Sequence, residues 1–402
     1  MGVGTDVWSR EISASSIDLI FKAKEGARAQ RINIRTGSCM NAIRKRVREF
    51  CERFGLQLPI LLAPMAGACP PSLSIAVANG GGMGACGALL MQPNEILAWV
   101  NEFRRGSSGL FQLNLWIPDP PAERDGERER RVREFLGKWG PQVREDAGDA
   151  TPPNFTAQCQ AFLEAAPPIV SSVMGLYSSD FVKQLKQRRI TWFANVSTVA
   201  EAVQAEHAGA DVVVVQGMEA GGHRGCFVAD EAERAQVGLM ALVPAAVDAV
   251  KIPVVATGGI ADARGVAAAL MLGASAAQVG TGFLRCPEAK LNPAWADALA
   301  KAAPEDTVVS RVFSGRAGRS LFTNYVRAAT ASGAPTPAPY PVQRGLTAGM
   351  RAEAQKSGDV QRMQAWAGQS ARLARKDPAE EFVRKLWEGT QHLLGWRNSQ
   401  SE

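Results

Sequence analysis

The segment TVAEAVQAEHAGADVVVVQG (198–217) decides the fold class of this chain. Its first half carries apolar residues at helical spacing, and Gly209 follows the last expected helical turn, where glycine accommodates a left-handed cap. Its second half is a run of valines, which is typical of a strand buried on both faces of a parallel sheet. The segment therefore predicts a helix followed by a strand that ends at a glycine-rich loop.

A second segment, DARGVAAALMLGASAAQVGT (262–281), has the same pattern, with Gly273 in the place of Gly209. One interpretation is a single structural unit that occurs twice in the chain. The alternative is that any two helix–strand units look alike at this level of detail. Both interpretations indicate an α/β fold with alternating helices and strands.

Eight short apolar runs recur along the chain, with helical spacing between most of them. Because all of them read as buried parallel strands, their number predicts a closed (β/α)8 TIM barrel rather than an open sheet. The runs are PILLAP (59–64), GMGACG (82–87), FQLNLW (111–116), PIVSSV (168–173), ITWFANV (190–196), DVVVVQG (211–217), IPVVATGG (252–259) and AAQVGTG (276–282).

Three regions are expected along the chain. Residues 1–55 form a leader and a first helix, and we expect part of this region to be disordered because the first 39 residues lack a core-forming pattern. These residues read either as a non-native or disordered leader, or as an arm that binds a partner. Residues 56–285 form the barrel, and the charged, Pro-rich stretch 118–153 is an insertion with one exposed helix near 128–138.

The last region, 286–402, is expected to complete the barrel and to form an additional helical C-terminal lobe at its mouth. A Pro-rich linker (333–341) precedes stretches with helical spacing. The predicted helices are 346–356, 358–375 and 378–395.

Composition excludes several classes of protein. The net charge of +6 lies mostly in residues 1–54, which hold eleven Lys or Arg and six Asp or Glu, and no basic stripe is interleaved with aromatic residues. Nucleic-acid binding is therefore not expected. No apolar stretch is long enough to span a membrane, and no signal peptide is evident. The scattered, odd-numbered cysteines contain no C-x-x-C pair, which argues against disulfides and zinc and favours a cytoplasmic location.

Glycine-rich loops follow the last three predicted strands: QGMEAGGHRG (216–225), TGGIAD (257–262) and GTGFLR (280–285). In a TIM barrel the active site lies at the carboxyl ends of the strands, and phosphate sites after the seventh and eighth strands are common. Glycine lets backbone N–H groups approach a phosphate closely. The last two loops therefore predict a mononucleotide phosphate site. The first strand lacks a following G-x-G-x-x-G, which disfavours a dinucleotide-binding domain.

His223 is the candidate catalytic base, because it follows two glycines directly beyond a buried strand. An imidazole titrates near neutral pH and suits proton transfer. A histidine on a loop can also be structural or merely solvated. His207, on a predicted helix, and His392, in the tail, read as surface or packing residues.

Other polar residues near predicted strand ends have two interpretations each. Asn114 and Gln216 are hydrogen-bonded core amides or contacts to a flavin ring edge, and Met65 is core filler or lies against a ring. Arg224 and Arg316 attract an anionic substrate, or are ordinary exposed arginines.

These segments together resemble the nitronate monooxygenase family over about residues 56–390. The matching motifs are PILLAPMAG (59–67), NGGGMGACG (79–87), QGMEAGGHRG (216–225), ATGGIAD (256–262), QVGTGF (278–283), FSGRAGRS (313–320) and WAGQSARLAR (366–375). The resemblance implies a barrel that holds FMN non-covalently and uses His223 as the catalytic residue. The residues expected at the FMN are Met65, Asn114, Gln216, Gly221, Gly222, Gly258, Gly259, Gln278, Val279, Gly280 and Thr281.

The activity implied is oxidation of alkyl nitronates, and of nitroalkanes, by O2 to carbonyl compounds and nitrite. The expected partners are therefore a nitronate and O2, with no metal. Flavin-dependent enoyl reductases and NADH:quinone reductases share this barrel, so an NAD(P)H-dependent flavin reductase acting on a quinone or enoyl thioester is the alternative. A third possibility is a flavin-binding barrel without catalysis.

Overall fold

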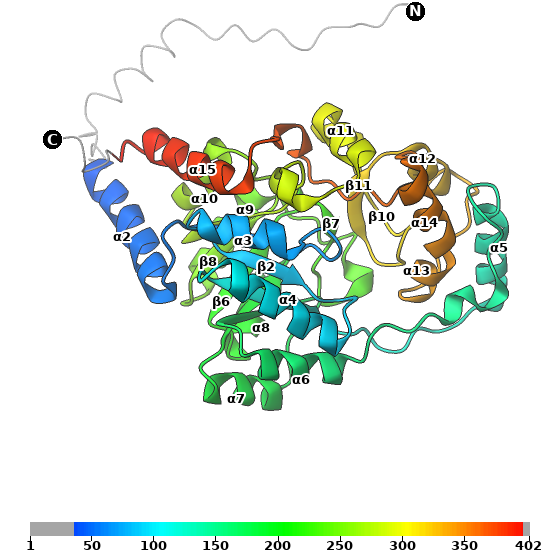
Figure 1. Cartoon of the computed structure of the whole chain (residues 1–402), viewed down its shortest axis with the longest axis horizontal. Coiled ribbons are helices and arrows are strands. Elements are labelled where there is room, and N and C mark those ends of the chain that lie inside the picture. Colours follow the sequence, from blue (N-terminus) through cyan, green and yellow to red (C-terminus); the bar gives the residue numbers. More distant parts are fainter. Residues whose placement is uncertain (1–35, 397–402) are drawn as a thin grey trace, which may run out of the picture. The chain divides into compact units, whose positions relative to one another are not determined.

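Eight parallel strands form the predicted barrel in the computed structural model, which describes residues 36–396 (Figure 1). Each predicted run contains one strand, so the fold-class prediction is confirmed. Of the region predicted as leader and first helix, 1–55, residues 1–35 lie outside the described residues. The barrel strands are β1 (Ile60–Leu62), β2 (Gly84–Gly87), β3 (Phe111–Trp116), β4 (Ile169–Val173), β5 (Thr191–Val196), β6 (Val212–Gln216), β8 (Val254–Thr257) and β9 (Ala276–Val279).

The barrel closes between its first two strands in the sequence. Strand β1 pairs with β9 on one side, and a bridge between Leu61 and Met83 joins it to the β2 side. Leu62 donates to the Met83 carbonyl at 2.8 Å, and Met83 donates to the Ile60 carbonyl at 3.1 Å. Closure leaves no free sheet edge, so the carboxyl ends of all eight strands meet around one opening.

Eight helices surround the strands, and the last of them arrives from far along the chain. Seven follow their strands directly or after an insertion: α3 (Pro71–Asn79), α4 (Pro93–Gly106), α6 (Phe155–Ala165), α7 (Ser179–Gln187), α8 (Val199–His207), α9 (Leu239–Ala249) and α10 (Ala263–Met271). The eighth, α15 (Ala379–Leu393), packs against both α10 and α3, the helices that flank the closure of the barrel. It therefore occupies the place of the helix after the eighth strand.

Side-chain caps determine where the helices that flank the site begin. Thr198 Oγ1 accepts from the Glu201 N–H at 3.1 Å, while the Glu201 carboxylate accepts from the Thr198 N–H, which makes a capping box at α8. The Asp262 carboxylate accepts from Arg264 and Gly265 at the start of α10. Such a cap contributes about 1 kcal/mol, and here it also ends the preceding strand-end loop at a defined residue.

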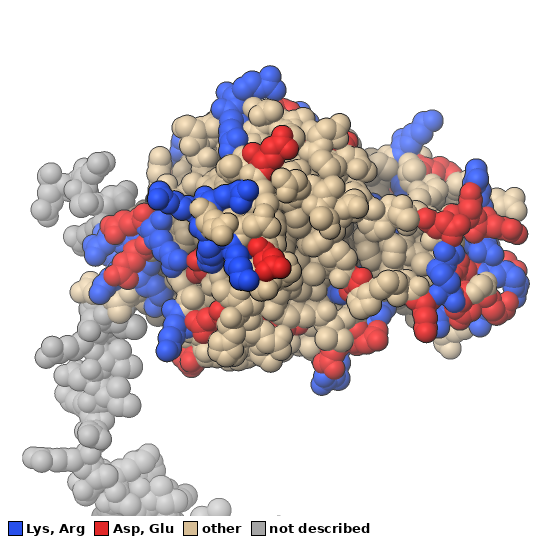
Figure 2. Space-filling model, turned by 90° about the horizontal axis from the view of Figure 1, so that it is seen from below, with Lys and Arg blue, Asp and Glu red and all other residues tan. Residues whose placement is uncertain are grey.

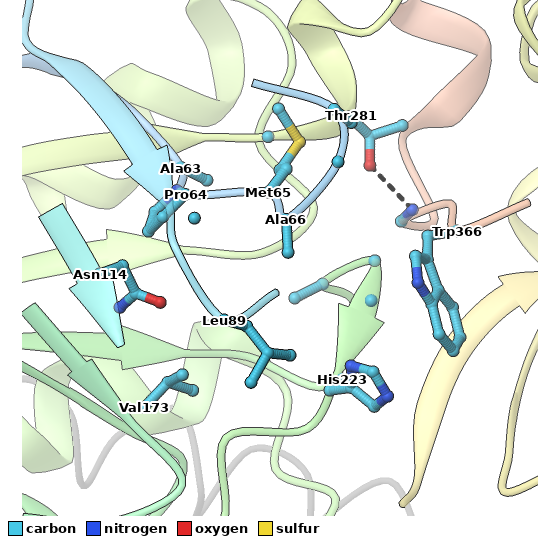
Figure 3. Close-up of a pocket in the computed structure, with 18 of the residues that line it drawn as sticks. Ala63, Pro64, Met65, Ala66, Leu89, Asn114, Val173, His223, Thr281 and Trp366 are labelled. Carbon is cyan, nitrogen blue, oxygen red and sulfur yellow. Dashed lines mark hydrogen bonds between the residues drawn. The ribbon is translucent and has the colours of Figure 1, made fainter. Parts of the chain in front are cut away.

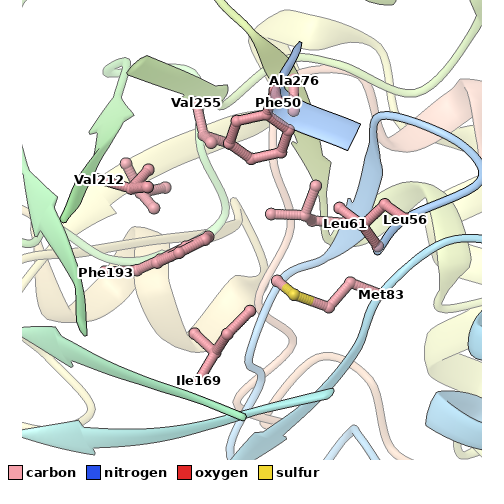
Figure 4. Close-up of a cluster of buried hydrophobic side chains, with 10 residues drawn as sticks. Phe50, Leu56, Leu61, Met83, Ile169, Phe193, Val212, Val255 and Ala276 are labelled. Atoms are coloured by element: carbon pink, nitrogen blue, oxygen red, sulfur yellow. The ribbon is translucent and has the colours of Figure 1, made fainter. Parts of the chain in front are cut away.

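The end of the barrel at which the strands begin is filled by apolar side chains, which Figure 4 shows converging from different strands. Phe50 from the helix α2 (Thr36–Phe54) joins Leu61, Phe193 and Val255 in this cluster. Phe54 meets Phe193 edge to face, with ring centroids 5.3 Å apart. Because this end is packed, the space for a ligand lies at the opposite, carboxyl end.

A lobe beside the barrel mouth combines two distant parts of the chain. Its core contains Val132 and Leu136 from the insertion together with Phe313, Tyr325 and Leu346. Its helices are α5 (Gly126–Leu136), α11 (Pro293–Lys301), α12 (Asn324–Ala329), α13 (Val342–Leu346) and α14 (Ala348–Ser357), and a small antiparallel sheet has the order β10 (Thr307–Ser310), β11 (Gly318–Leu321), β7 (Gly222–His223). The additional lobe was predicted, but its sheet was not.

The predicted helix over 358–375 is wrong. Only a short 3-10 turn at Ala371–Leu373 is helical in this segment. Its backbone pairs with distant parts of the chain instead: Leu321 of β11 donates to the Ala365 carbonyl, and Gly368 donates to Thr281 Oγ1. These long-range hydrogen bonds override a helical spacing of apolar residues.

The charged insertion presents both acidic and basic side chains on an exposed surface. Figure 2 shows acidic and basic side chains intermixed at the end of the molecule where α5 lies. Arg124 pairs with Glu129 at 2.6 Å and with Asp149 at 2.7 Å. Within the described residues, no helix has both the length and the apolar character needed to cross a membrane.

Candidate active site

A cavity of about 610 Å³ opens at the carboxyl ends of the barrel strands, between the barrel and the lobe (Figure 3). This volume lies within the usual range for small-molecule sites, about 300–1,000 Å³. The predicted site residues that line it are Met65, Asn114, Gln216, Gly221, Gly222, His223, Gly258, Gly259, Gln278, Gly280 and Thr281.

Val279 is placed differently from the other predicted site residues. Its side chain is fully buried in β9, and its carbonyl accepts from the Ala63 N–H at 2.9 Å. The side chain and the carbonyl of Val279 are therefore part of the packing and hydrogen bonding of the barrel wall.

Buried amides form the floor of the cavity. Gln112 Nε2 donates to Gln278 Oε1 at 3.1 Å, and Asn114 Nδ2 donates to Ser171 Oγ at 3.0 Å. Gln112 Oε1 and Asn195 Oδ1 are buried acceptors without a partner in the described part of the chain. Because such atoms are costly to leave unpaired, they fit a ligand with N–H donors. The pyrimidine edge of a flavin is a ligand of this kind.

The glycine loops that follow β8 and β9 form one wall of the cavity together with the segment after Trp366. Gly258 and Gly259 have φ of +117° and +67°, conformations that favour glycine. Thr281 Oγ1 accepts from the Gly368 N–H at 3.0 Å (Figure 3), and Ser370 Oγ donates to the Gly259 carbonyl. The loops are therefore held together in a form that exposes backbone at the cavity, as a phosphate site requires.

Gln216 holds the histidine loop in addition to lining the cavity. Its Oε1 accepts from the Gly225 N–H at 2.8 Å, and its Nε2 donates to the His223 carbonyl at 3.1 Å. The amide therefore fixes the backbone on both sides of Arg224.

His223 lies at the edge of the cavity, between two indole rings. Its ring centroid is 4.7 Å from that of Trp116 and 4.8 Å from that of Trp366. Burial, followed by the positive charges of Arg316 and Arg344, lowers the pKa of His223 from 6.5 to about 3. The imidazole is therefore neutral at pH 7, with a nitrogen lone pair available for a proton.

Ser314 contacts one of the two ring nitrogens of His223. Its Oγ lies 2.7 Å from His223 Nε2 and 3.2 Å from the Arg316 carbonyl oxygen, and it accepts from the Arg316 N–H. When the hydroxyl donates to that carbonyl, Nε2–H donates to Oγ, and Nδ1 is left as the proton acceptor. Ser314 lies in the motif FSGRAGRS, but its contact with His223, 91 residues away along the chain, was not predicted.

Arg224 and Arg316 are neither exposed nor free, which corrects both interpretations of them. Each is 1% exposed. Arg224 donates to the carbonyls of Gln216, Gly217 and Ala235, and Arg316 pairs with Asp119. Both therefore hold strand-end loops in place.

The cationic groups that do face the cavity are Arg344 and Arg351 of the lobe, which the sequence analysis missed. Among the described residues that line the cavity, none carries a carboxylate. Arg344 has no carboxylate partner within the described residues. Burial and the neighbouring Arg344 lower the pKa of Arg351 to about 10, so it is still charged at pH 7. The cavity is therefore positive on its lobe side.

A family model for nitronate monooxygenase matches residues 49–389. The chain belongs to the nitronate monooxygenase family. A nitronate monooxygenase of Paraburkholderia phytofirmans is 36% identical over 347 residues, covering 83% of this chain and 92% of that protein. This membership makes the chain an oxidoreductase of a flavin-dependent family.

Solved structures show the same architecture. The nitroalkane oxidase of Streptomyces ansochromogenes superimposes with a TM-score of 0.77 at 33% identity, covering 84% of this chain and 96% of that one. FabK of Thermotoga maritima superimposes with a TM-score of 0.68 at 26% identity, covering 86% and 97%. The overall architecture of this chain is therefore similar to that of both solved structures.

Proposed function

We propose that this member of the family oxidises alkyl nitronates and nitroalkanes with O2 as co-substrate and FMN as cofactor. The observation that carries the proposal is that the imidazole of His223 lines the same cavity as the two glycine loops. Gly258, Gly259, Gly280 and Thr281 would hold the phosphate, and the amide floor would hold the ring edge. When bound, FMN supplies the electron acceptor, and the products are a carbonyl compound and nitrite.

The chain's own part in the reaction is proton transfer and charge stabilisation. His223 Nδ1 accepts the proton from the carbon next to the nitro group, and the C–H electron pair moves into that group to form the nitronate. Trp116 and Trp366 pack against the imidazole and hold its orientation. Arg344 provides positive charge near the anion that forms.

An anaerobic reduction assay tests this function. We expect a preformed alkyl nitronate to bleach the flavin of the holoenzyme within a turnover time, and NADH or NADPH to leave it oxidised. Flavin absorbance in a stopped-flow instrument without O2 gives both rates. Rapid bleaching by NADH with a slow response to nitronate would instead support an NAD(P)H-dependent reductase.

Replacing Arg344 is expected to weaken nitronate binding. In Arg344→Met the KM for a preformed nitronate rises about tenfold or more, because hydrogen bonds to charged groups contribute roughly 1.5–3 kcal/mol. The KM for the neutral nitroalkane changes less. Arg327→Met, at an exposed arginine of α12 in the same lobe, is the matched control. Equal rises for both substrate forms would contradict a role for the Arg344 charge.

A further inference from the structure

Arg316 forms an ion pair with Asp119 beneath the wall of the cavity. Arg316 Nε donates to Asp119 Oδ2 at 2.9 Å, and its Nη2 donates to the other carboxylate oxygen. The arginine side chain is 1% exposed and the aspartate 18%. Nη1 donates to the Cys226 carbonyl at 2.9 Å and contacts Met174 Sδ. One guanidinium thus joins loops that follow three barrel strands.

The same arginine reaches His223 by two routes. Its backbone N–H and carbonyl both bond Ser314 Oγ, the partner of His223 Nε2. Its guanidinium carbon lies 5.8 Å from the centroid of Trp116, whose ring packs on the imidazole. The Arg316 charge disfavours a second proton on His223 and lowers its pKa, after burial itself. Arg316 therefore orients the imidazole and also opposes its protonation.

Asp119 is the carboxylate that pairs with this arginine. We propose that Asp119 is a positioning residue for proton abstraction: by pairing with Arg316 it screens the guanidinium, so that His223 can accept the substrate proton. This inference rests on the proposed role of His223 as base. In the step concerned, the substrate C–H bond breaks, the N–H bond at Nδ1 forms, and the electron pair stays on the substrate as nitronate.

Other charged and titratable groups near His223 do not replace Asp119. Arg344 and Tyr340 line the cavity from the side of α13. Arg344 is a cation, and Tyr340 stays neutral at pH 7 because burial raises its pKa further above the usual value. Arg224, directly after β7, and Arg319, on β11, donate to backbone carbonyls. Within the described residues, the carboxylate that pairs with Arg316 is that of Asp119.

The first test removes the carboxylate. In the FMN-loaded full chain, Asp119→Asn is expected to lower kcat/KM for a neutral nitroalkane about tenfold, because an unscreened guanidinium makes His223 a weaker base. Oxidation of the preformed nitronate, normalised to bound flavin, stays within about twofold since it requires no proton abstraction. Asp149→Asn, which removes another insertion carboxylate paired with Arg124, is the matched control.

A double variant tests whether Asp119 acts by screening the charge of Arg316 or only by holding the loops together. Asp119→Asn with Arg316→Gln removes both charges, so nitroalkane turnover is expected to recover relative to Asp119→Asn alone. If the pair only holds the loops together, the double variant is at least as impaired as the single one, and the proposal fails. Equal losses on nitroalkane and nitronate in Asp119→Asn would also overturn it.

A readout independent of turnover comes from the histidines themselves. The chain has three, so labelled-histidine NMR of the holoenzyme shows three side-chain signals, and His223→Asn identifies one of them. We expect the His223 signal to titrate at least one pH unit higher in the double variant than in Asp119→Asn. Equal midpoints would refute screening. If His223→Asn itself leaves nitroalkane turnover intact, the proposed base has failed rather than the role of Asp119.

Discussion

Replacing His223 with asparagine is expected to lower kcat/KM for neutral nitroalkanes by about 10²–10⁴-fold, the usual loss for a general base. The substitution removes Nδ1 as the proton acceptor between Trp116 and Trp366. Preformed nitronate needs no deprotonation, so its oxidation is expected to fall far less. The measurement is kcat/KM for each substrate form, normalised to bound flavin.

The control for this variant is His207→Asn, at the last residue of α8 outside the cavity. It should leave both rates within about twofold of the starting protein, as is usual for substitutions away from buried features. A purely structural role for His223 predicts that both substrates decline together with flavin occupancy. Equal losses on nitroalkane and nitronate would therefore refute the base.

Replacing Gly280 with valine is expected to reduce flavin retention at least tenfold without unfolding the barrel. Gly280 has a negative φ of −109°, so a side chain there is not forced into the left-handed region, and an added Cβ would lie 3.3 Å from Ala63 Cβ and 3.5 Å from Met65 Sδ. The branched methyl groups must then extend into the cavity, where the phosphate would lie. Flavin content after gel filtration, with the cofactor released by denaturation and identified by chromatography, measures the effect.

Gly258 is a poorer choice for the same experiment. Its φ of +117° strains any side chain, and a Cβ would lie 3.1 Å from the Gly217 carbonyl oxygen, so lost flavin and lost stability could not be separated. Gly137→Val is the matched control, since Gly137 has φ of −59° and its nearest neighbours would be 3.5 Å away. Normal flavin content in Gly280→Val, or release of FAD from the starting protein, would show that the FMN phosphate is not held there.

Most of the barrel follows from local sequence pattern. The valine run of β6 and the glycines that end α8 and α10 report buried strands and helix caps within a few residues of each other. Since parallel strands in a closed barrel share one carboxyl end, the polar loops after β6, β8 and β9 had to converge. His223 and the glycine loops were identifiable for this reason.

The surroundings of His223 depended on tertiary structure alone. Ser314, Trp366 and Arg344 come from the lobe, far along the chain, and no periodicity encodes which distant segment covers the barrel mouth. Arg316 illustrates the limit: its sequence context is compatible with a solvent-exposed arginine, whereas the fold buries it completely against Asp119.

The segment 358–375 shows the physical reason why local sequence pattern does not predict such long-range contacts. Its apolar spacing predicts a helix, but its N–H groups donate to β11, to Glu219 and to Thr281, which are distant in sequence. A backbone donor can make a local or a long-range hydrogen bond, and the packing of the whole chain selects between them. Local pattern therefore determined the barrel and the loops at its mouth, whereas only the tertiary structure decided which side chains and charges surround the histidine.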